Sequence, residues 1–266
     1  MQTATSPDGT TIAYDTYGSG PALILVGGAF QYRAFDPASA RLAQMLGQRF
    51  TTVHYDRRGR GDSTDTPPYD PAREVEDLAA VIEQVGGPAR LFGMSSGGVL
   101  ALEAAAAGLD IARVAVYEPP LIVDDTREPV PADYLATLDA LVGEGRRGDA
   151  VAYAMATAMG VPEEMVASMR QGPAWAAFEA VAHTLAYDGA FMAPLMQGRP
   201  LDLPAWSSAK LPVLVIGGGD SPPWIRHAAD AVVQALPKAR GQTLDHQTHA
   251  VAPEVLAPVL ADFLRR

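Results

Sequence analysis

The apolar run Ala22–Val26 is typical of a strand buried on both faces of a parallel sheet, and similar short β-rich runs recur along this 266-residue chain. The runs lie at Ala22–Val26, Thr51–Tyr55, Arg90–Phe92, Arg113–Tyr117, Val213–Ile216 and Gly241–Leu244. Helical periodicity separates or follows them, at residues 37–47, 72–85, 97–108, 223–236 and 253–265. The N-terminal segment instead alternates in strand fashion around a turn at Pro7-Asp8-Gly9. Because strands and helices alternate, we predict an α/β fold whose mostly parallel sheet carries helices on both faces.

One long interval interrupts this alternation. From Leu121 to Trp206 the pattern indicates only helical stretches rich in Ala, Met and Glu, broken by glycines and prolines. We therefore predict that residues 1–120 and 207–266 form the core domain. Residues 121–206 are predicted to form a helical cap inserted into that core.

The composition narrows the classes of partner. The formal net charge is −11, so phosphate backbones and anionic membrane surfaces would repel the chain. The basic cluster of Arg57, Arg58 and Arg60 is short, and we expect a loop with local salt bridges and hydrogen bonds. We therefore expect a protein with no nucleic-acid partner and no membrane partner.

The chain has no cysteine, which excludes disulfides, thiolate catalysis and cysteine-based metal sites. Its first residues lack the apolar core of a signal peptide, and no apolar run reaches the roughly 18 residues needed to span a membrane. The expected location is the cytoplasm. No histidine–carboxylate cluster has the spacing of metal ligands, so no metal is expected.

A Gly-x-Ser-x-Gly motif, Gly93-Met94-Ser95-Ser96-Gly97, lies between a predicted strand and a helix rich in Ala and Leu. This is the setting of a nucleophile elbow, in which a serine occupies a strained turn and small neighbours let strand and helix approach. An incidental serine in a glycine-rich turn is the alternative. The strand–turn–helix context favours Ser95 as a catalytic nucleophile.

A nucleophilic serine needs a histidine as general base and an acid that orients the histidine. Asp220 follows the predicted strand Val213–Ile216 at its carboxyl end, where sites form in open α/β sheets, and is the candidate acid. Asp220 also suits a second role, as the N-cap of the next helix. Two histidines, His246 and His249, follow the last predicted strand, and either could reach Ser95.

The whole chain resembles α/β-hydrolase-fold proteins of the serine-hydrolase branch, close to a bacterial, actinobacterial-like subgroup. The features that carry the resemblance are Tyr55–Ser63, the Ser95 motif, Tyr117–Pro120, Gly219–Pro222 and Gln247–His249. The resemblance implies an eight-stranded sheet and a Ser-His-acid triad that works without a cofactor.

The resemblance also implies roles for single residues. Similar proteins follow the last strand with Gly-Gln-x-His, which makes His249 the base, whereas counting back from Pro253, as in longer relatives, favours His246. Some relatives supply their acid from the end of the strand before the cap. Glu118 stands at that place and is the rival of Asp220.

The oxyanion hole implied by the resemblance uses two backbone N–H groups, those of Ser96 and Ala29. The chain departs from the family at two nearby places. The family's usual His-Gly pair is here Gly27-Gly28, and the usual histidine before the nucleophile is Met94. Backbone donors survive such changes, although the rigidity of the loop does not follow from the sequence.

The predicted cap is rich in methionine and aromatic residues. Six of the nine methionines occur there as pairs four residues apart, at Met155/Met159, Met165/Met169 and Met192/Met196. Most of these side chains are expected to pack the cap on the core, and some must roof a pocket. The residues expected to contact substrate are Phe30, Met94, Trp175, Phe191 and Trp224.

An adaptable apolar roof favours a hydrophobic acyl, aryl or polyketide-like small molecule as the substrate. The sequence therefore predicts an esterase-, lactonase- or thioesterase-like serine hydrolase acting as a monomer or homodimer. The alternative hypothesis keeps the fold without the hydrolysis: a cyclase, lyase or binding protein for a natural-product intermediate. The departures at Val26–Gly28 and Met94 keep this alternative open.

Overall fold

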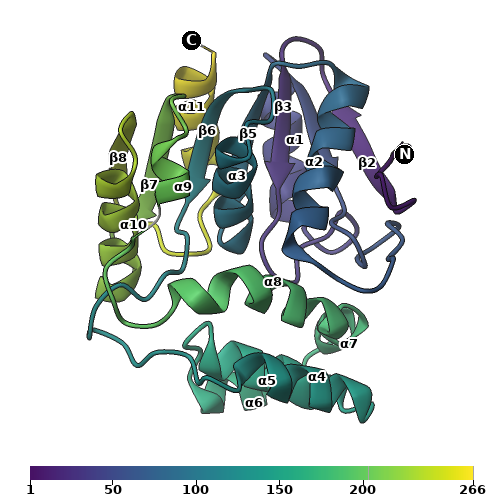
Figure 1. The fold of residues 1–266 in the computed structure, drawn as a ribbon, viewed down its shortest axis with the longest axis vertical. Coiled ribbons are helices and arrows are strands. Elements are labelled where there is room, and N and C mark those ends of the chain that lie inside the picture. The colour runs from purple at the N-terminus through teal and green to yellow at the C-terminus, as the bar shows by residue number, and fades with distance from the viewer. Residues whose placement is uncertain (203, 266) are drawn as a thin grey trace.

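The strands form one eight-stranded sheet in a computed structural model that describes residues 1–202 and 204–265 (Figure 1). The sheet order is β1-β2-β4-β3-β5-β6-β7-β8. β1 pairs antiparallel with β2, β2 pairs antiparallel with β4, and all the other pairings are parallel. The bounds are β1 Gln2–Thr5, β2 Thr11–Tyr17, β3 Ala22–Val26, β4 Thr51–Tyr55, β5 Ala89–Met94, β6 Ile111–Tyr117, β7 Val213–Gly218 and β8 Ala239–Leu244. The predicted α/β fold with an eight-stranded, mostly parallel sheet is confirmed.

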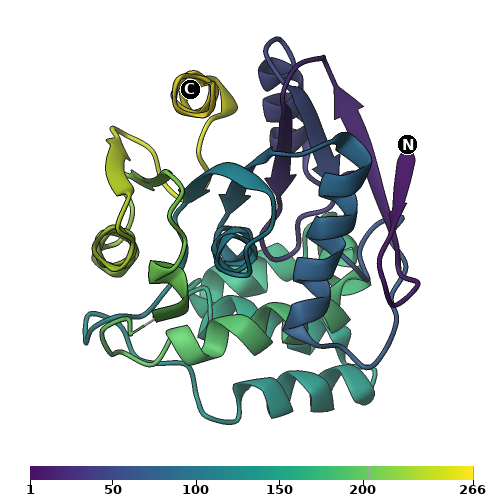
Figure 2. The ribbon, with the colours of Figure 1, turned by 45° about the horizontal axis from the view of Figure 1, so that its top comes forward.

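Helices cover both faces of the sheet, so its central strands are buried throughout (Figure 2). In β3 alternate side chains enter different cores, with Ile24 and Val26 on one face and Leu23 and Leu25 on the other. The first face is covered by α2 (Pro71–Val85), α3 (Ser96–Ala106) and α10 (Pro223–Ala235). The second is covered by α1 (Pro37–Leu46) and α11 (Pro253–Leu264).

Local sequence signals fix the starts of two core helices. Asp36 caps α1 by accepting a hydrogen bond from the Ser39 N–H at 3.0 Å, and Asp70 caps α2 through the Ala72 N–H at 2.8 Å. A proline follows each cap as the first helical residue, where its missing N–H costs nothing. These signals explain why both helices begin within one residue of the predicted positions.

Between β6 and β7 the described chain is helical (Figure 1). The elements are α4 Tyr134–Gly143, α5 Arg147–Thr157, α6 Glu163–Arg170, α7 Trp175–Ala180, the 3₁₀ helix Ala182–Thr184, α8 Leu185–Met192, the 3₁₀ helix Ala193–Leu195 and α9 Pro204–Ser207. α8 lies against the core, where it contacts α2 and α3, and α4 to α6 form a more distant layer. We call residues 121–206 the cap.

The chain rejoins the core at the end of this segment. Trp206 is buried, and its indole N–H donates to Glu103 on α3 at 2.8 Å. Within the described ranges, no helix combines the length and the apolar character that crossing a membrane requires.

Candidate active site

Ser95 occupies a sharp turn between β5 and α3. Its backbone has φ 55° and ψ −128°, a conformation that a non-glycine residue adopts only under strain. Glycines make the turn sterically feasible, because a Cβ on Gly93 would lie 2.4 Å from the Gly97 carbonyl oxygen. A Cβ on Gly97 would lie 2.2 Å from the Val26 carbonyl oxygen on β3. This is the geometry of a nucleophile elbow.

Glu118 and His249 form a hydrogen-bonded pair beside this turn. The Ser95 N–H donates to the Tyr117 carbonyl at 2.9 Å, and Glu118 is the next residue after Tyr117. Oε2 of Glu118 lies 2.9 Å from Nδ1 of His249. A carboxylate only accepts hydrogen bonds, so Nδ1 carries the proton and Nε2, across the ring, is the basic nitrogen.

The Glu118 carboxylate is completely buried and held from its other side. Its Oε1 accepts the Gly218 N–H at 2.7 Å and the Ser221 hydroxyl at 2.5 Å. The backbone of Glu118 has φ 45°, which turns the chain out of β6. A second hydrogen bond fixes the histidine loop, because the Tyr117 hydroxyl donates to the Thr248 carbonyl at 2.6 Å.

The prediction that Asp220 contacts the histidine base is wrong. β7 runs through Gly218, and the following turn directs Asp220 outward, so its side chain is 59% exposed. Its carboxylate lies 3.9 Å from Nδ1 of His246, whose side chain is 91% exposed. Asp220 does not cap α10 either, since the residue at that N-cap is Pro222. Of the two proposed pairings, the structure forms the one between His249 and Glu118.

The loop after β3 approaches the elbow closely. A Cβ on Gly28 would lie 2.8 Å from the Ser95 Cβ and 2.9 Å from the Met94 carbonyl oxygen, so only glycine fits there. The Gly28 N–H donates to the Gln31 side-chain oxygen at 2.6 Å. Ala29, the residue implied to supply an oxyanion donor, therefore follows a fixed glycine beside Ser95. The other implied donor, Ser96, is the first residue of α3, where a backbone N–H has no intrahelical partner.

Two of the predicted substrate-contacting residues belong to one aromatic group that joins this loop to the cap. The Phe30 ring meets the Phe178 ring of α7 edge-on at 5.0 Å, and Phe35 meets the same ring at 5.1 Å. Trp175 lies 6.2 Å from Phe178, and Phe30 and Trp175 are both buried. Met94, the third of the predicted residues, is half-buried directly before Ser95.

The remaining two predicted contacts have arginine partners. The Phe191 ring lies 5.6 Å from the Arg57 guanidinium, and the Trp224 ring lies 4.3 Å from that of Arg127. Phe178 is the residue that sequence reasoning undervalued: its contact with Phe30 depends on how α7 docks, which no local pattern encodes. Of the cap methionines, Met165 is 55% exposed and points away from the core.

The arginine cluster is buried, and its contacts are only partly local. Arg57 makes a bidentate pair with Glu74, with both contacts at 2.6 Å, and Arg58 makes one with Asp77, with both at 2.7 Å. Arg57 and Arg60 also reach Asp188 on the cap helix α8. The expectation of local salt bridges thus missed a contact across more than 120 residues of sequence.

Charge compensation makes this buried cluster tolerable. Burial opposes ionisation of Asp188, but the charges of Arg57 and Arg60 outweigh it and hold the pKa of Asp188 below its ordinary value. Burial likewise opposes the charge of Arg57, and Asp188 and Glu74 overcome it and raise the Arg57 pKa. The two cations Arg57 and Arg60 are therefore balanced by the two anions Glu74 and Asp188.

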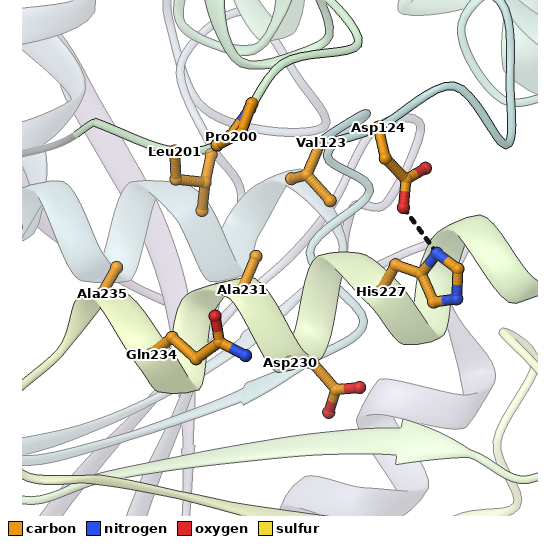
Figure 3. Close-up of a pocket in the computed structure, with 9 residues that line it drawn as sticks. All are labelled: Val123, Asp124, Pro200, Leu201, His227, Asp230, Ala231, Gln234 and Ala235. Carbon is orange, nitrogen blue, oxygen red and sulfur yellow. Dashed lines mark hydrogen bonds and ion pairs between the residues drawn. The ribbon is translucent and has the colours of Figure 1, made fainter.

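A separate cavity of about 410 Å³ lies between the two ends of the cap and α10 (Figure 3). Its lining includes Asp124 and His227, whose carboxylate and Nδ1 are 2.6 Å apart, and Leu201. Neither Ser95 nor His249 lines it, and none of its lining residues is a serine. This cavity is therefore distinct from the turn that carries Ser95.

The described residues contain no group of three or more His, Asp or Glu side chains that could hold a metal ion. The chemistry available at the elbow is thus that of a strained serine, a histidine with a buried carboxylate, and backbone N–H donors.

Comparison with known proteins agrees with this fold. A model of the alpha/beta hydrolase family matches residues 22–259. An alpha/beta hydrolase from Sphaerobacter thermophilus DSM 20745 has 54% sequence identity and a TM-score of 0.91, over 99% of this chain and 100% of that one.

Two more distant structures share the fold. An enol-lactonase from Burkholderia xenovorans LB400 has 22% identity and a TM-score of 0.70, with both chains covered completely. An esterase from Rhodococcus sp. ECU1013 has 22% identity and a TM-score of 0.65, over 99% of this chain and 98% of that one.

Proposed function

Because the chain belongs to the alpha/beta hydrolase family, we propose that it hydrolyses a carboxylic ester, thioester or lactone of a hydrophobic small molecule. Ser95 is the nucleophile, His249 the general base and Glu118 the acid that orients it. The observation that carries the proposal is the 2.9 Å contact between His249 and the buried Glu118, beside a strained serine.

In the first half-reaction the Ser95 hydroxyl oxygen attacks the substrate carbonyl carbon and passes its proton to Nε2 of His249. The Glu118 carboxylate stabilises the imidazolium through Nδ1–H. The N–H groups of Ala29 and Ser96 stabilise the negative charge on the former carbonyl oxygen. The bond to the leaving alcohol or thiol then breaks, and that group takes the proton from Nε2, leaving an acyl-enzyme.

In the second half-reaction water gives a proton to Nε2 and attacks the acyl carbon. The intermediate collapses, the bond to Ser95 breaks, and Ser95 regains the proton. The products are the carboxylic acid and the regenerated enzyme. For a lactone the leaving hydroxyl stays attached to the acid, so one hydroxy acid is released.

Two further features support an ester-type bond in a hydrophobic molecule. The enol-lactonase and the esterase that share this fold are named for such chemistry. Phe30, two residues after the Gly28 that approaches Ser95, and Phe178 of the cap supply an apolar wall. A protein that only binds its ligand needs no histidine paired with a buried carboxylate, so the pair favours an enzyme over a binding protein.

The test is labelling with a fluorophosphonate, followed by a panel of acyl esters of increasing chain length. We expect covalent modification at Ser95, located by peptide mass spectrometry, and ester turnover that Ser95→Ala abolishes. An unlabelled wild-type protein that turns over no ester would support the template or binding alternative.

A further inference from the structure

Arg60 fixes the orientation of one peptide group in the loop after β3. We call this loop, residues 27–31, the oxyanion loop. Its Nη1 donates to the Gly28 carbonyl at 2.6 Å, and the Gln31 N–H donates to the same oxygen at 3.2 Å. The peptide joining Gly28 to Ala29 is planar and trans, so its C=O and N–H point in opposite directions. Because the carbonyl faces the buried Arg60, the Ala29 N–H faces away from it. Among the described residues, this N–H has no hydrogen-bond acceptor.

The second donor is fixed from the same cluster. The Ser96 hydroxyl donates to Oδ1 of Asp188 at 2.7 Å, which ties the first residue of α3 to the cap helix α8. The Ser96 hydroxyl is thus engaged with Asp188. Its backbone N–H remains at the N-terminus of α3, where the helix dipole favours negative charge.

A single carboxylate connects both anchors. Oδ1 of Asp188 accepts from Ser96 and from Arg57 at 2.7 Å, and Oδ2 accepts from Arg60. Arg57 extends the arrangement by donating to the Gly27 carbonyl at 3.3 Å. Asp188 comes from the cap, whereas all its partners belong to the core, and every one of these charged side chains is buried.

We propose that Asp188 and Arg60 are positioning residues for the oxyanion hole, and that a docked cap is therefore required for efficient transition-state stabilisation. This inference rests on the proposed function, since it assigns the Ala29 and Ser96 N–H groups to that hole. The Arg60 charge also polarises the Gly28–Ala29 peptide and strengthens its N–H as a donor. Neither side chain touches the reacting atoms, so both act through the backbone.

The alternative is that this cluster only attaches the cap. Asp77 provides a matched control, because it is a buried aspartate in a bidentate pair with Arg58 and has no contact with the oxyanion loop. Asp188→Asn and Asp77→Asn make the same chemical change to a buried ion pair. Both should lower the melting temperature, but only the first should disturb the donors.

The experiment measures kcat and KM for an activated aryl ester and the affinity for phenylboronic acid. Boronic acids bind by forming a tetrahedral adduct with the serine oxygen, and so report on the oxyanion hole. We expect Asp188→Asn to lower kcat roughly 10- to 100-fold with little change in KM, and to weaken phenylboronic acid binding in parallel. Asp77→Asn should leave kcat and this affinity within about twofold of wild type.

A second variant covers the case in which Asp188→Asn does not fold. Arg60→Lys keeps the charge but cannot bridge the Gly28 carbonyl and Asp188 in the same way. It should lower kcat about 10-fold and weaken phenylboronic acid binding by a similar factor.

Two results are distinguishable. An active wild-type enzyme whose Asp188→Asn and Arg60→Lys variants keep kcat and phenylboronic acid affinity, or lose them no more than Asp77→Asn, overturns the positioning inference alone. A wild-type protein that neither hydrolyses any ester nor binds phenylboronic acid contradicts the proposed function itself.

Discussion

Two carboxylate–histidine pairs follow the last strands of the sheet, and they differ in distance and in the burial of the carboxylate. His249 meets Glu118 at 2.9 Å, and the carboxylate has no solvent exposure. His246, three residues earlier, lies 3.9 Å from Asp220, and both of these side chains are mostly exposed. Both pairs form near the carboxyl ends of β6 to β8, and all four residues were candidates from the sequence.

Burial of the carboxylate allows Glu118 to orient the imidazole of His249, whereas the exposed Asp220 does not orient that of His246. The Glu118 carboxylate is fixed by the Gly218 N–H and the Ser221 hydroxyl, so its second oxygen holds the ring in one orientation and one tautomer. An exposed pair at 3.9 Å competes with water and contributes little. Two carboxylate–histidine pairs therefore differ in geometry because of where the backbone places them.

The loss of activity in Ser95→Ala is the reference for the losses expected in variants of the two pairs. Ser95→Ala should lower kcat/KM for an activated ester by about 10⁴-fold or more, because the acyl-enzyme route is lost. Steady-state assays on protein free of wild-type contamination measure this. Turnover that persists unchanged would remove Ser95 from the mechanism.

Alanine variants of the two histidines should differ strongly in activity. His249→Ala should match the loss in Ser95→Ala, since members of a triad act as a unit, whereas His246→Ala should stay within about threefold of wild type. The two variants are compared in the same assay. The opposite order would mean that the C-terminal loop rearranges to present His246.

Asp188 tests the effect of burial on stability. Asp188→Asn leaves two arginines undercompensated and should lower the free energy of unfolding by about 3 kcal/mol at neutral pH. The folded-state pKa of Asp188 lies below its ordinary value of 3.8, so its ionisation stabilises the fold above about pH 4. This contribution is lost as the pH falls through the folded-state pKa. The difference between wild type and variant in urea titrations should therefore shrink below about pH 4, and a difference independent of pH would contradict the charge argument.

The cap should change selectivity more than rate. Phe178→Ala removes the ring that packs on Phe30 and should alter the ratio of kcat/KM between acetate and bulky aryl esters about 10-fold. Met165→Ala, on the exposed side of the cap, is the matched control and should leave the ratio unchanged. If Phe178→Ala changes kcat/KM for both esters by the same factor, this part of the cap only excludes water.

The smallest effect is expected at the exposed pair. Asp220→Asn should change kcat/KM by no more than about twofold and leave the melting temperature within experimental error, as is usual for an exposed polar substitution. A loss above 10-fold would restore Asp220 as a functional acid.

Local pattern was sufficient for the fold and for the strand–turn–helix setting of Ser95. A few consecutive residues determine each of these elements. Examples are the all-apolar run Ala22–Val26 and the capped, proline-initiated starts of α1 and α2. The Gly93–Gly97 motif is local in the same sense. A Cβ on Gly93 would clash within the strand–turn–helix unit, and a Cβ on Gly97 would clash with the adjoining β3.

The acid and the cap contacts could not be predicted in this way. Glu118 and Asp220 both follow strands that end at the site, and the choice between them depends on the turn after Gly218 and on Ser221, which a chain pattern does not resolve. Asp188 is the one acidic residue of the mostly apolar helix α8. Its contacts with Arg57, Arg60 and Ser96 exist only once the cap has docked.

The most direct test of the Glu118–His249 pair is kcat/KM for an activated ester in Glu118→Gln and Asp220→Asn, measured side by side. Glutamine keeps the size and the acceptor oxygen of Glu118 but removes the charge that stabilises the imidazolium. We predict a loss of about 10³- to 10⁴-fold for Glu118→Gln and no more than about twofold for Asp220→Asn. A large loss in Asp220→Asn with an active Glu118→Gln enzyme would contradict the account.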